Sequence, residues 1–230
     1  MAKFFIPTSI LRIINLKVKY LFKLMKCIAH RGYSLKYKDN SVQAIKEALF
    51  RGYDGVEIDI QLCDTGEIVV FHDTYIDNHF LSDMTAKQLK QKDIHTLREI
   101  YDEIPEIKDV PLFLDLKGNN TKLVNALIDF YKKEPVENVT FCSFNRNLIY
   151  NLPIHFNKGS TFETTFIDDE FDTLTRNLSC VLLHWTCLDH HFIAYCRSNK
   201  IKVYTYTHKE DMELTYMYKY NVDGIITNGF

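Results

Sequence analysis

Histidine, arginine and acidic side chains follow short apolar runs of this sequence. The apolar residues at 27–29 precede His30, Arg31 and Gly32, and a second apolar run ends in His72 and Asp73. An imidazole exchanges protons near neutral pH, and a guanidinium group binds phosphate oxygens in pairs. Two histidines at strand ends are what acid and base catalysis requires on opposite sides of a scissile bond. A lone histidine is more often structural, so it is the occurrence of two histidines, each at the end of an apolar run, that indicates catalysis.

Two carboxylates share one face of a predicted strand at residues 56–60. The segment reads VEIDI, so Glu57 and Asp59 point one way and the apolar residues point the other. Paired carboxylates that are partly buried are costly unless protons or a cation neutralise them, and Mg²⁺ and Ca²⁺ prefer carboxylate oxygens. The pattern therefore favours a metal site, and the alternative is a solvated polar face on an edge strand.

The segment 112–117, LFLDLK, repeats this design. Its apolar residues face one way, while Asp115 and Lys117 share the other face at the end of the strand. A third carboxylate and a cation thus arrive together. The alternative is a salt bridge confined to the strand end, although neighbours two residues apart on one face are poorly placed to satisfy each other fully.

The elements that must position these residues alternate between two periods. Strands are expected at 27–30, 56–60, 112–116, 139–142, 159–164, 181–184, 201–206 and 224–227. Helices are expected at 41–50, 121–131, 188–197 and 209–219. This alternation predicts a parallel sheet, and eight strands fit a closed TIM (β/α)8 barrel of the α/β class. The sequence contains no G-x-G-x-x-G fingerprint of a dinucleotide-binding sheet.

One connection in this order is too short for a parallel crossover. Only a few residues around Thr65 separate the strand at 56–60 from the apolar run at 68–71. We therefore expect a β-hairpin extension after the second strand, which brings His72 and Asp73 close to Glu57. Barrel active sites lie at the carboxyl ends of the strands, so we expect the chemistry there.

The composition is that of one soluble domain. The chain has 230 residues, 46% hydrophobic and 25% charged, and a net charge of −2 gives no indication of a nucleic-acid partner. Its six cysteines are dispersed among apolar stretches, which favours reduced thiols in the core. The sequence contains no CxxC pair, and the His190-His191 doublet has no partners at the spacing of a zinc site.

The basic charge is concentrated at the N-terminus. Residues 1–26 carry six lysines or arginines and no acidic residue, which leaves −8 for the remainder. An extra amphipathic basic helix is expected there, either packed on the domain or lying on an anionic membrane surface. Because charges interrupt the apolar run, we expect no signal peptide and no transmembrane span. The expected location is intracellular, either cytoplasmic or peripheral to a membrane.

The motifs occur in the order found in one enzyme family. They are His30-Arg31-Gly32, the helix start at 39–41, the segment 52–59, Thr65-Gly66, His72-Asp73, Asp115-Leu116-Lys117, Ser143-Phe144, Val203-Tyr204-Thr205 and 222–227. In this combination the sequence resembles the glycerophosphodiester phosphodiesterase family, which has a TIM barrel like that of phosphatidylinositol phospholipase C. The resemblance covers a barrel domain at residues 27–230 and leaves residues 1–26 as a separate segment.

The resemblance implies roles for seven residues. His30 and His72 would be the acid and base, Arg31 and Lys117 would bind phosphate, and Glu57, Asp59 and Asp115 would hold one divalent cation, Mg²⁺ or Ca²⁺. The first nucleophile would be water or a neighbouring hydroxyl group of the substrate. The histidines would move protons from the attacking hydroxyl or water and to the leaving alkoxide.

Several positions depart from the family pattern. Asp115 stands for the usual Glu and is shorter by one methylene group, and Asn228 stands for a usual Asp. Asp39 is expected to cap the helix that follows it. The segment 74–79 lacks the usual L-D-R-T-T sequence, so the choice of substrate is the least determined property.

The leading hypothesis is a metal-dependent hydrolase that releases glycerol 3-phosphate and an alcohol from a glycerophosphodiester, with a role in glycerol and lipid metabolism. One alternative is a lysophospholipase D or sphingomyelinase D-like enzyme acting on a lysophospholipid or related lipid, with peripheral membrane contact through residues 1–26. A further alternative is a catalytically silent, membrane-associated barrel that binds phosphate. The aromatic residues Trp185, Tyr204 and Tyr206 could line the mouth, although aromatic residues at strand ends more often serve packing.

Overall fold

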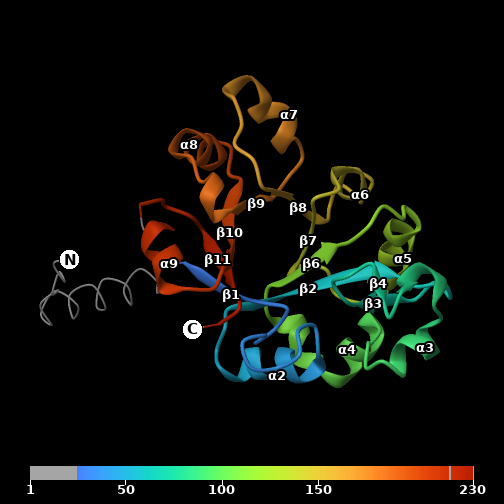
Figure 1. The fold of residues 1–230 in the computed structure, drawn as a ribbon. Helices are drawn as coiled ribbons and strands as arrows, with labels where there is room; N and C mark the ends of the chain where they lie inside the picture. Colours follow the sequence, from blue (N-terminus) through green and yellow to red (C-terminus); the bar gives the residue numbers. More distant parts are fainter. Residues whose placement is uncertain (1–24, 218, 230) are drawn as a thin grey trace, which may run out of the picture.

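Eight parallel strands close into a barrel in the computed structural model, which describes residues 25–217 and 219–229 (Figure 1). The strands are β1 (Lys26–His30), β2 (Gly55–Leu62), β6 (Leu112–Leu116), β7 (Val139–Ser143), β8 (Asn157–Phe162), β9 (Cys180–His184), β10 (Lys202–His208) and β11 (Gly224–Thr227). Pairing of β1 with both β2 and β11 closes the ring. The predicted TIM barrel is confirmed, including the weakly predicted strand β8.

Helices surround the barrel on its outside (Figure 1). They are α2 (Val42–Phe50), α3 (Ala86–Lys90), α4 (Leu97–Glu103), α5 (Lys122–Tyr131), α6 (Arg146–Tyr150), α7 (Phe171–Thr175), α8 (His190–Ser198) and α9 (Asp211–Met217). Short 3₁₀ turns occur at Leu81–Asp83, Pro105–Asp109, Asp168–Glu170 and Trp185–Cys187. Of these elements, the sequence predicted α2, α5, α8 and α9, and it indicated none of those between β3 and β6.

The start of α2 corrects one expectation. Ser41, not Asp39, is the N-cap residue, because its side chain accepts a hydrogen bond from the backbone N–H of Ala44. Asn40 has a φ of 58°, which turns the chain between Asp39 and the helix. Asp39 therefore lies too early to cap the helix and instead pairs with Arg31.

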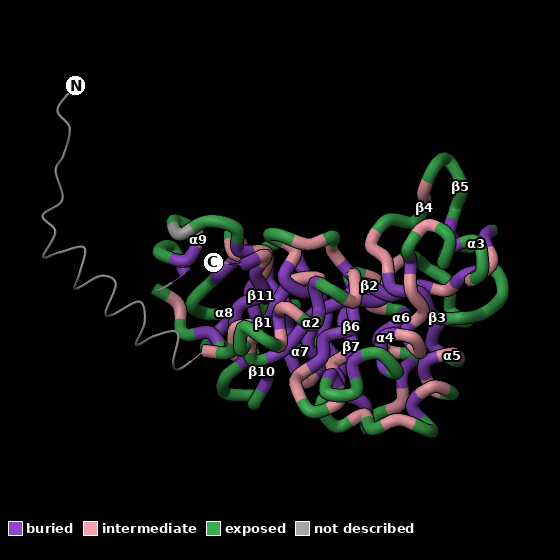
Figure 2. The backbone as a smooth tube through the Cα atoms, turned by 90° about the horizontal axis from the view of Figure 1, so that it is seen from below, coloured by how far each residue is buried: buried purple, intermediate pink, exposed green. Residues whose placement is uncertain are grey.

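The predicted hairpin after β2 is also present. Strand β3 (Ile68–Val70) runs antiparallel to β2, with Val70 opposite Ile60. A second hairpin, β4 (Tyr75–Ile76) with β5 (His79–Phe80), follows it and projects from the body of the molecule (Figure 2). The chain thus leaves the barrel after β2 and returns through α3 and α4 before β6.

Alternation along the strands separates two cores. Outward-facing residues such as Ile58 and Leu114 are fully buried under the helices. Inward-facing residues form a second cluster, which contains Phe113 and Tyr204. We call the part of the barrel interior that holds these two residues its lower half, and the part at the carboxyl ends of the strands its upper half. Gly224 makes room for this cluster, since a Cβ atom there would lie 2.8 Å from the ring of Tyr204.

Several expectations concern features away from the site. All six cysteines are free thiols, and Cys27 and Cys187 are only partly buried. Within the described ranges, no helix is long and apolar enough to cross a membrane. The predicted basic helix at 1–26 lies almost wholly outside the described residues, so the proposed domain boundary remains a prediction.

Candidate active site

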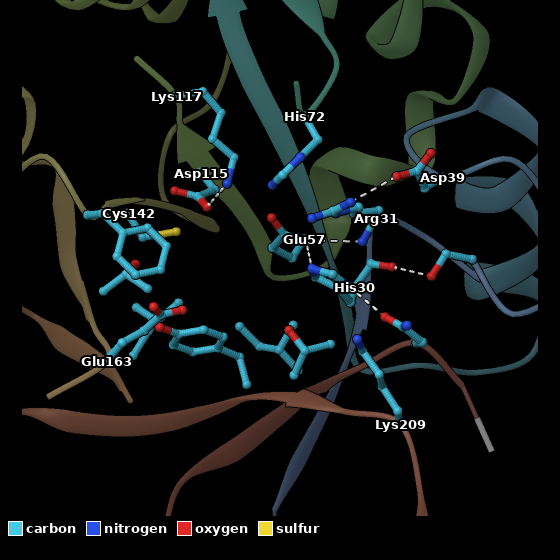
Figure 3. A pocket seen from close by; sticks show the side chains of 18 residues that line it. His30, Arg31, Asp39, Glu57, His72, Asp115, Lys117, Cys142, Glu163 and Lys209 are labelled. Carbon is cyan, nitrogen blue, oxygen red and sulfur yellow. Dashed lines mark hydrogen bonds and ion pairs between the residues drawn. The ribbon is translucent and has the colours of Figure 1, made fainter. Parts of the chain in front are cut away.

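A cavity of about 500 Å³ opens at the carboxyl ends of the barrel strands (Figure 3). Six of the seven predicted site residues line it, namely His30, Arg31, Glu57, His72, Asp115 and Lys117. The seventh, Asp59, is 1% exposed and lies behind them, in contact with Arg31 and Lys117. The structure therefore brings all seven predicted residues together at the expected end of the barrel.

Three buried carboxylates form the base of the site. Glu57 and Asp59 come from the inward face of β2, and Asp115 lies opposite Asp59 on the neighbouring strand β6. Each residue offers one oxygen atom, and these atoms all lie within 4.8 Å of one another. No other such group of potential metal ligands occurs in the described part of the chain.

Burial and mutual repulsion shift the pKa values of this cluster. Burial, together with the charges of Asp59 and Asp115, raises the pKa of Glu57 well above its usual range. Burial also raises the pKa of Asp115 to about 6, against the opposing effect of Lys117. The pKa of Asp59 is lowered although burial opposes this, because Lys117 and Arg31 stabilise its charge. The cluster therefore carries too much negative charge for its surroundings.

Lys117 partly neutralises the carboxylates. Its Nζ atom lies 2.6 Å from Asp115 Oδ2, to which it donates a hydrogen bond, and 2.9 Å from Asp59 Oδ1. Asp115 and Lys117 do pair, because the long lysine side chain reaches back over the strand end, but they do not satisfy each other fully, since Asp115 Oδ1 accepts no hydrogen bond from the described residues. Lys117 therefore forms the salt bridge to Asp115 and also presents a positive charge to the cavity.

Arg31 supplies a second positive charge from the loop after β1. Its Nε atom lies 3.0 Å from Asp59 Oδ2, its guanidinium group donates to Asp39, and its backbone N–H donates to Glu57 Oε2 over 3.0 Å. The loop is tight, since Gly32 has a φ of 76° and a Cβ atom there would lie 2.6 Å from the backbone of α2. Gly32 thus allows this loop to pass against the helix and hold Arg31 over β2.

The donor set fits a divalent cation. Asp115 Oδ1 is buried and accepts no hydrogen bond from the described residues, whereas the buried Asp59 Oδ1 lies 2.9 Å from the ammonium group of Lys117. Buried carboxylate oxygens are normally satisfied, so the Asp115 oxygen marks a place for a further partner. All three residues offer the hard oxygen ligands that Mg²⁺ and Ca²⁺ prefer.

Two histidines face the cavity from different elements. His30 ends β1, and its Nδ1 atom lies 2.6 Å from Asn228 Oδ1, while its Nε2 atom lies 3.9 Å from Glu57 Oε2. Burial, reinforced by the charge of Arg31, lowers the pKa of His30 to about 4. His72 follows β3, and its Nδ1 atom lies 2.7 Å from Asp73 Oδ1.

Three amides that hold these side chains were missed in the sequence. Asn40 donates to Asp59 Oδ2 over 2.7 Å and accepts from the backbone N–H of Asp59. Gln61 donates to the carbonyl groups of Phe71 and Asp73, which fixes the segment that carries His72. Asn228 holds His30. The departures at 39–41 and at Asn228 drew attention to two of the three amides, but nothing in the pattern indicated their partners.

The far wall of the cavity is aromatic and acidic. It is lined by Phe144, Thr161, Glu163 and Tyr206, together with Leu182. Of the aromatic residues considered for the mouth, Tyr206 lines the cavity, whereas Tyr204 packs in the lower interior of the barrel.

Comparisons with known proteins agree with this geometry. The sequence profile of the "Glycerophosphoryl diester phosphodiesterase family" matches residues 30–154. A glycerophosphodiester phosphodiesterase from Caldanaerobacter subterraneus subsp. tengcongensis is 28% identical over 228 residues, covering 87% of this chain and 93% of that protein. Glycerophosphodiester phosphodiesterase 1 from Homo sapiens is 30% identical over 149 residues, covering 56% of this chain and 45% of that protein.

The fold is similar to that of a solved phosphodiesterase from Oleispira antarctica, determined in complex with the product sn-glycerol-3-phosphate. The TM-score is 0.79 at 21% sequence identity, covering 91% of this chain and 94% of that one. The profile match spans more than half of the chain and contains both histidines and all three carboxylates of the site. The chain therefore belongs to the glycerophosphoryl diester phosphodiesterase family.

Proposed function

We propose that this protein is a phosphodiesterase, dependent on a divalent cation, that hydrolyses glycerophosphodiesters to glycerol 3-phosphate and an alcohol. The observation that carries the proposal is the convergence of two histidines, two cations and three buried carboxylates on one cavity. The names of the relatives and the product bound to the Oleispira antarctica enzyme support the same reaction.

In this proposal, Glu57, Asp59 and Asp115 hold the divalent cation. Mg²⁺ and Ca²⁺ both suit these ligands, and the bound ion would offset negative charge on the phosphoryl oxygens. The buried Asp115 oxygen that has no hydrogen-bond partner, and the Asp59 oxygen that pairs with Lys117, are the positions where such an ion would find ligands.

Arg31 and Lys117 are the proposed phosphate ligands. Both now pair with Asp59, at 3.0 Å and 2.9 Å respectively, so each must share its charge with a substrate. A cation on the carboxylates would release part of this pairing. The guanidinium and ammonium donors would then stabilise the charge that develops on phosphorus substituents in the transition state.

The histidines have different hydrogen bonds, which suggest different roles. Donation from His30 Nδ1 to Asn228 Oδ1 leaves the lone pair on Nε2, beside Glu57, so His30 is suited to accept a proton from water or a substrate hydroxyl. His72 Nδ1 lies 2.7 Å from the Asp73 carboxylate, which orients the ring, and we assign to His72 the protonation of the leaving alkoxide.

A phosphodiester in a lipid is a second candidate substrate. The observation that favours it is a set of large apolar side chains, more than half exposed, on loops and on the hairpin that follow β1, β3 and β8. They are Leu35, Tyr75, Phe80 and Ile167. If lysophosphatidylcholine vesicles release choline and glycerophosphocholine does not, the lipid is the substrate.

The proposal is tested by measuring release of glycerol 3-phosphate with Mg²⁺ or Ca²⁺ and with EDTA. EDTA, His30→Ala and Glu57→Ala are each expected to abolish release, whereas His155→Ala, a control at an exposed position remote from the cavity, should leave it unchanged. If both site variants keep full activity, the site assignment is wrong. A folded protein that binds phosphate but cleaves none of these substrates would instead be a silent phosphate-binding barrel.

A further inference from the structure

One wall of the cavity takes no part in the proposed reaction. It consists of Phe144, which follows β7, Thr161 on β8, Glu163 just after β8 and Tyr206 on β10. We refer to these four residues as the far-wall subsite. Figure 3 shows Glu163 across the cavity from His30.

Two aromatic rings form a corner in the far-wall subsite. The rings of Phe144 and Tyr206 are nearly perpendicular, at 86°, with their centroids 6.0 Å apart. The Tyr206 hydroxyl donates to the carbonyl group of Phe162 over 3.0 Å, which fixes its ring. Phe144 is 49% exposed although it is large and apolar. A fixed corner of this kind presents two ring surfaces to a ligand.

The polar groups of the subsite are negative or neutral. None of the ion pairs in the described ranges includes Glu163, so its carboxylate has no basic partner there. Thr161 is 6% exposed, and its Oγ1 atom is buried without a hydrogen-bond partner. Its strand position, opposite Leu182, turns it inward. The Glu163 carboxylate and the Thr161 hydroxyl can each accept a hydrogen bond or face a cation.

The charges of the cavity are therefore separated. The phosphate end carries Arg31 and Lys117, and Lys209 lines the cavity on the side of His30 (Figure 3), whereas the far wall carries the Glu163 carboxylate and two aromatic rings. We propose that the far-wall subsite binds a cationic alcohol of the substrate, such as the ammonium group of choline or ethanolamine, in a zwitterionic glycerophosphodiester. This inference rests on the proposed function and deepens it by naming the class of alcohol.

A cation suits this wall better than a neutral polyol does. Aromatic faces attract ammonium groups through their quadrupoles, and a nearby carboxylate adds a direct attraction. A polyol would need several hydrogen-bond partners, whereas the wall offers the Thr161 hydroxyl, one carboxylate and the apolar surface of Leu182, and the Tyr206 hydroxyl already donates its proton to Phe162. The anionic phosphate and the ammonium group would then each lie at the end of opposite charge.

The test compares two substrates of the same shape. Glycerophosphocholine carries a quaternary ammonium group, and its 3,3-dimethylbutyl analogue has a neutral tert-butyl group in that place. We expect the wild type to prefer the choline ester by about tenfold in kcat/KM. An equal kcat/KM for the two esters would overturn the proposal.

Two variants locate the preference. Glu163→Gln is expected to lower kcat/KM for the choline ester about tenfold and to leave the neutral analogue nearly unchanged, and Phe144→Leu is expected to act in the same direction by a few-fold. Glu137→Gln, at an exposed carboxylate at the opposite end of the barrel, is the matched control and should change neither. Equal losses on both esters would show instead that Glu163 contacts the glycerol moiety that both share.

A binding measurement separates this inference from the proposed function. Choline chloride is titrated into the wild type, Glu163→Gln and Glu137→Gln, and binding is followed by calorimetry without turnover. Binding that is lost only in Glu163→Gln supports the subsite even if no diester is cleaved. Hydrolysis of diesters by a protein that binds no choline, or binds it equally well without Glu163, would overturn the subsite and leave the phosphodiesterase intact.

Discussion

The barrel interior has two halves that the same strands build in opposite ways. In the lower half, Phe113 and Tyr204 pack edge to face, with ring centroids 4.8 Å apart, in an apolar cluster. In the upper half, Glu57, Asp59 and Asp115 crowd three carboxylates together. Strand β6 contributes Phe113 to one half and Asp115 to the other, only two residues later. One pleat repeat therefore separates residues that stabilise the fold from residues positioned for chemistry.

The difference shows where this fold tolerates unfavourable interactions. Glycines let the side chains of the lower half pack closely, and a Cβ atom at Gly159 would lie only 2.8 Å from the Sγ atom of Cys180. The upper half keeps buried oxygens without partners and carboxylates with raised pKa values. Stability and chemistry should therefore respond to different substitutions, and four experiments test this separation.

The largest effect is expected from Glu57→Gln in the upper half. Loss of this carboxylate should lower kcat/KM by more than about 10³-fold, because the cation loses a ligand. The free energy of unfolding should not fall, since repulsion from Asp59 and Asp115 is relieved. Urea unfolding and phosphodiesterase assays measure the two quantities on one preparation. A large loss of stability with little loss of activity would reverse the assignment of the two halves.

The converse experiment is Phe113→Ala in the lower half. Removing this fully enclosed ring should lower the free energy of unfolding by about 4 kcal/mol, through lost burial and a residual cavity. Activity per folded molecule should stay within a few-fold of the wild type. Phe50→Ala is the matched control, because Phe50 is 87% exposed and should cost little. If Phe113→Ala lowered the activity per folded molecule as much as substitution of a proposed catalytic residue does, stability and chemistry would not be separated between the two halves.

Acid should lower the stability of the fold through His208, a buried histidine to which we assign no catalytic role. His208 is fully buried at the end of β10, and burial lowers its pKa from 6.5 to about 4. The neutral form is favoured on folding, so its contribution is complete above pH 6.5 and decreases as the pH falls toward 4, by about 3 kcal/mol. The measurement is urea unfolding between pH 7 and pH 4 in EDTA.

The matched comparison for this pH effect is His208→Gln against the wild type. Glu57 and Asp115 have raised pKa values and shift stability in the opposite direction, so only the difference between the two proteins isolates His208. His155→Gln, at an exposed position, should retain the wild-type slope. Parallel pH curves for the wild type and His208→Gln would show that His208 does not titrate as described.

The smallest effect is expected from Asn228→Ala. Asn228 is a positioning residue that fixes the ring of His30 through a 2.6 Å hydrogen bond. Its loss should lower kcat about tenfold and change the pH dependence of kcat, with little change in KM. Asn228→Asp, which keeps an acceptor at this position, should restore most of the rate. A change in KM alone would assign Asn228 to substrate binding.

Much of the fold could be predicted because its signals are local. The VEIDI and LFLDLK patterns place apolar residues under the helices and carboxylates in the barrel, as observed for Ile58 and Asp59. The hairpin at β3 followed from the length of one connection alone. The elements between β3 and β6 were not predicted, because α3 has only five residues and α4 only seven, too short for a clear period.

The supporting contacts of the site could not be predicted, because their partners are distant in the chain. Asn40 reaches Asp59 across 19 positions, and His30 reaches Asn228 across 198. Neither pair shares a period or a motif, and only closure of the barrel between β1 and β11 brings the second pair together. The residue types of the reaction were visible in the sequence, whereas the amides that orient them were not.

The two histidines lie at the ends of strands that are paired to different extents. His30 ends a barrel strand that is bonded on both sides, by β2 and β11. His72 stands at the end of a strand that, within the described chain, pairs with β2 alone and makes one further bridge at Thr96. Insertions in the projecting hairpin can therefore alter the spacing between the two imidazoles without remodelling the barrel, so this excursion is the place where substrate range can diverge while the carboxylate cluster stays fixed.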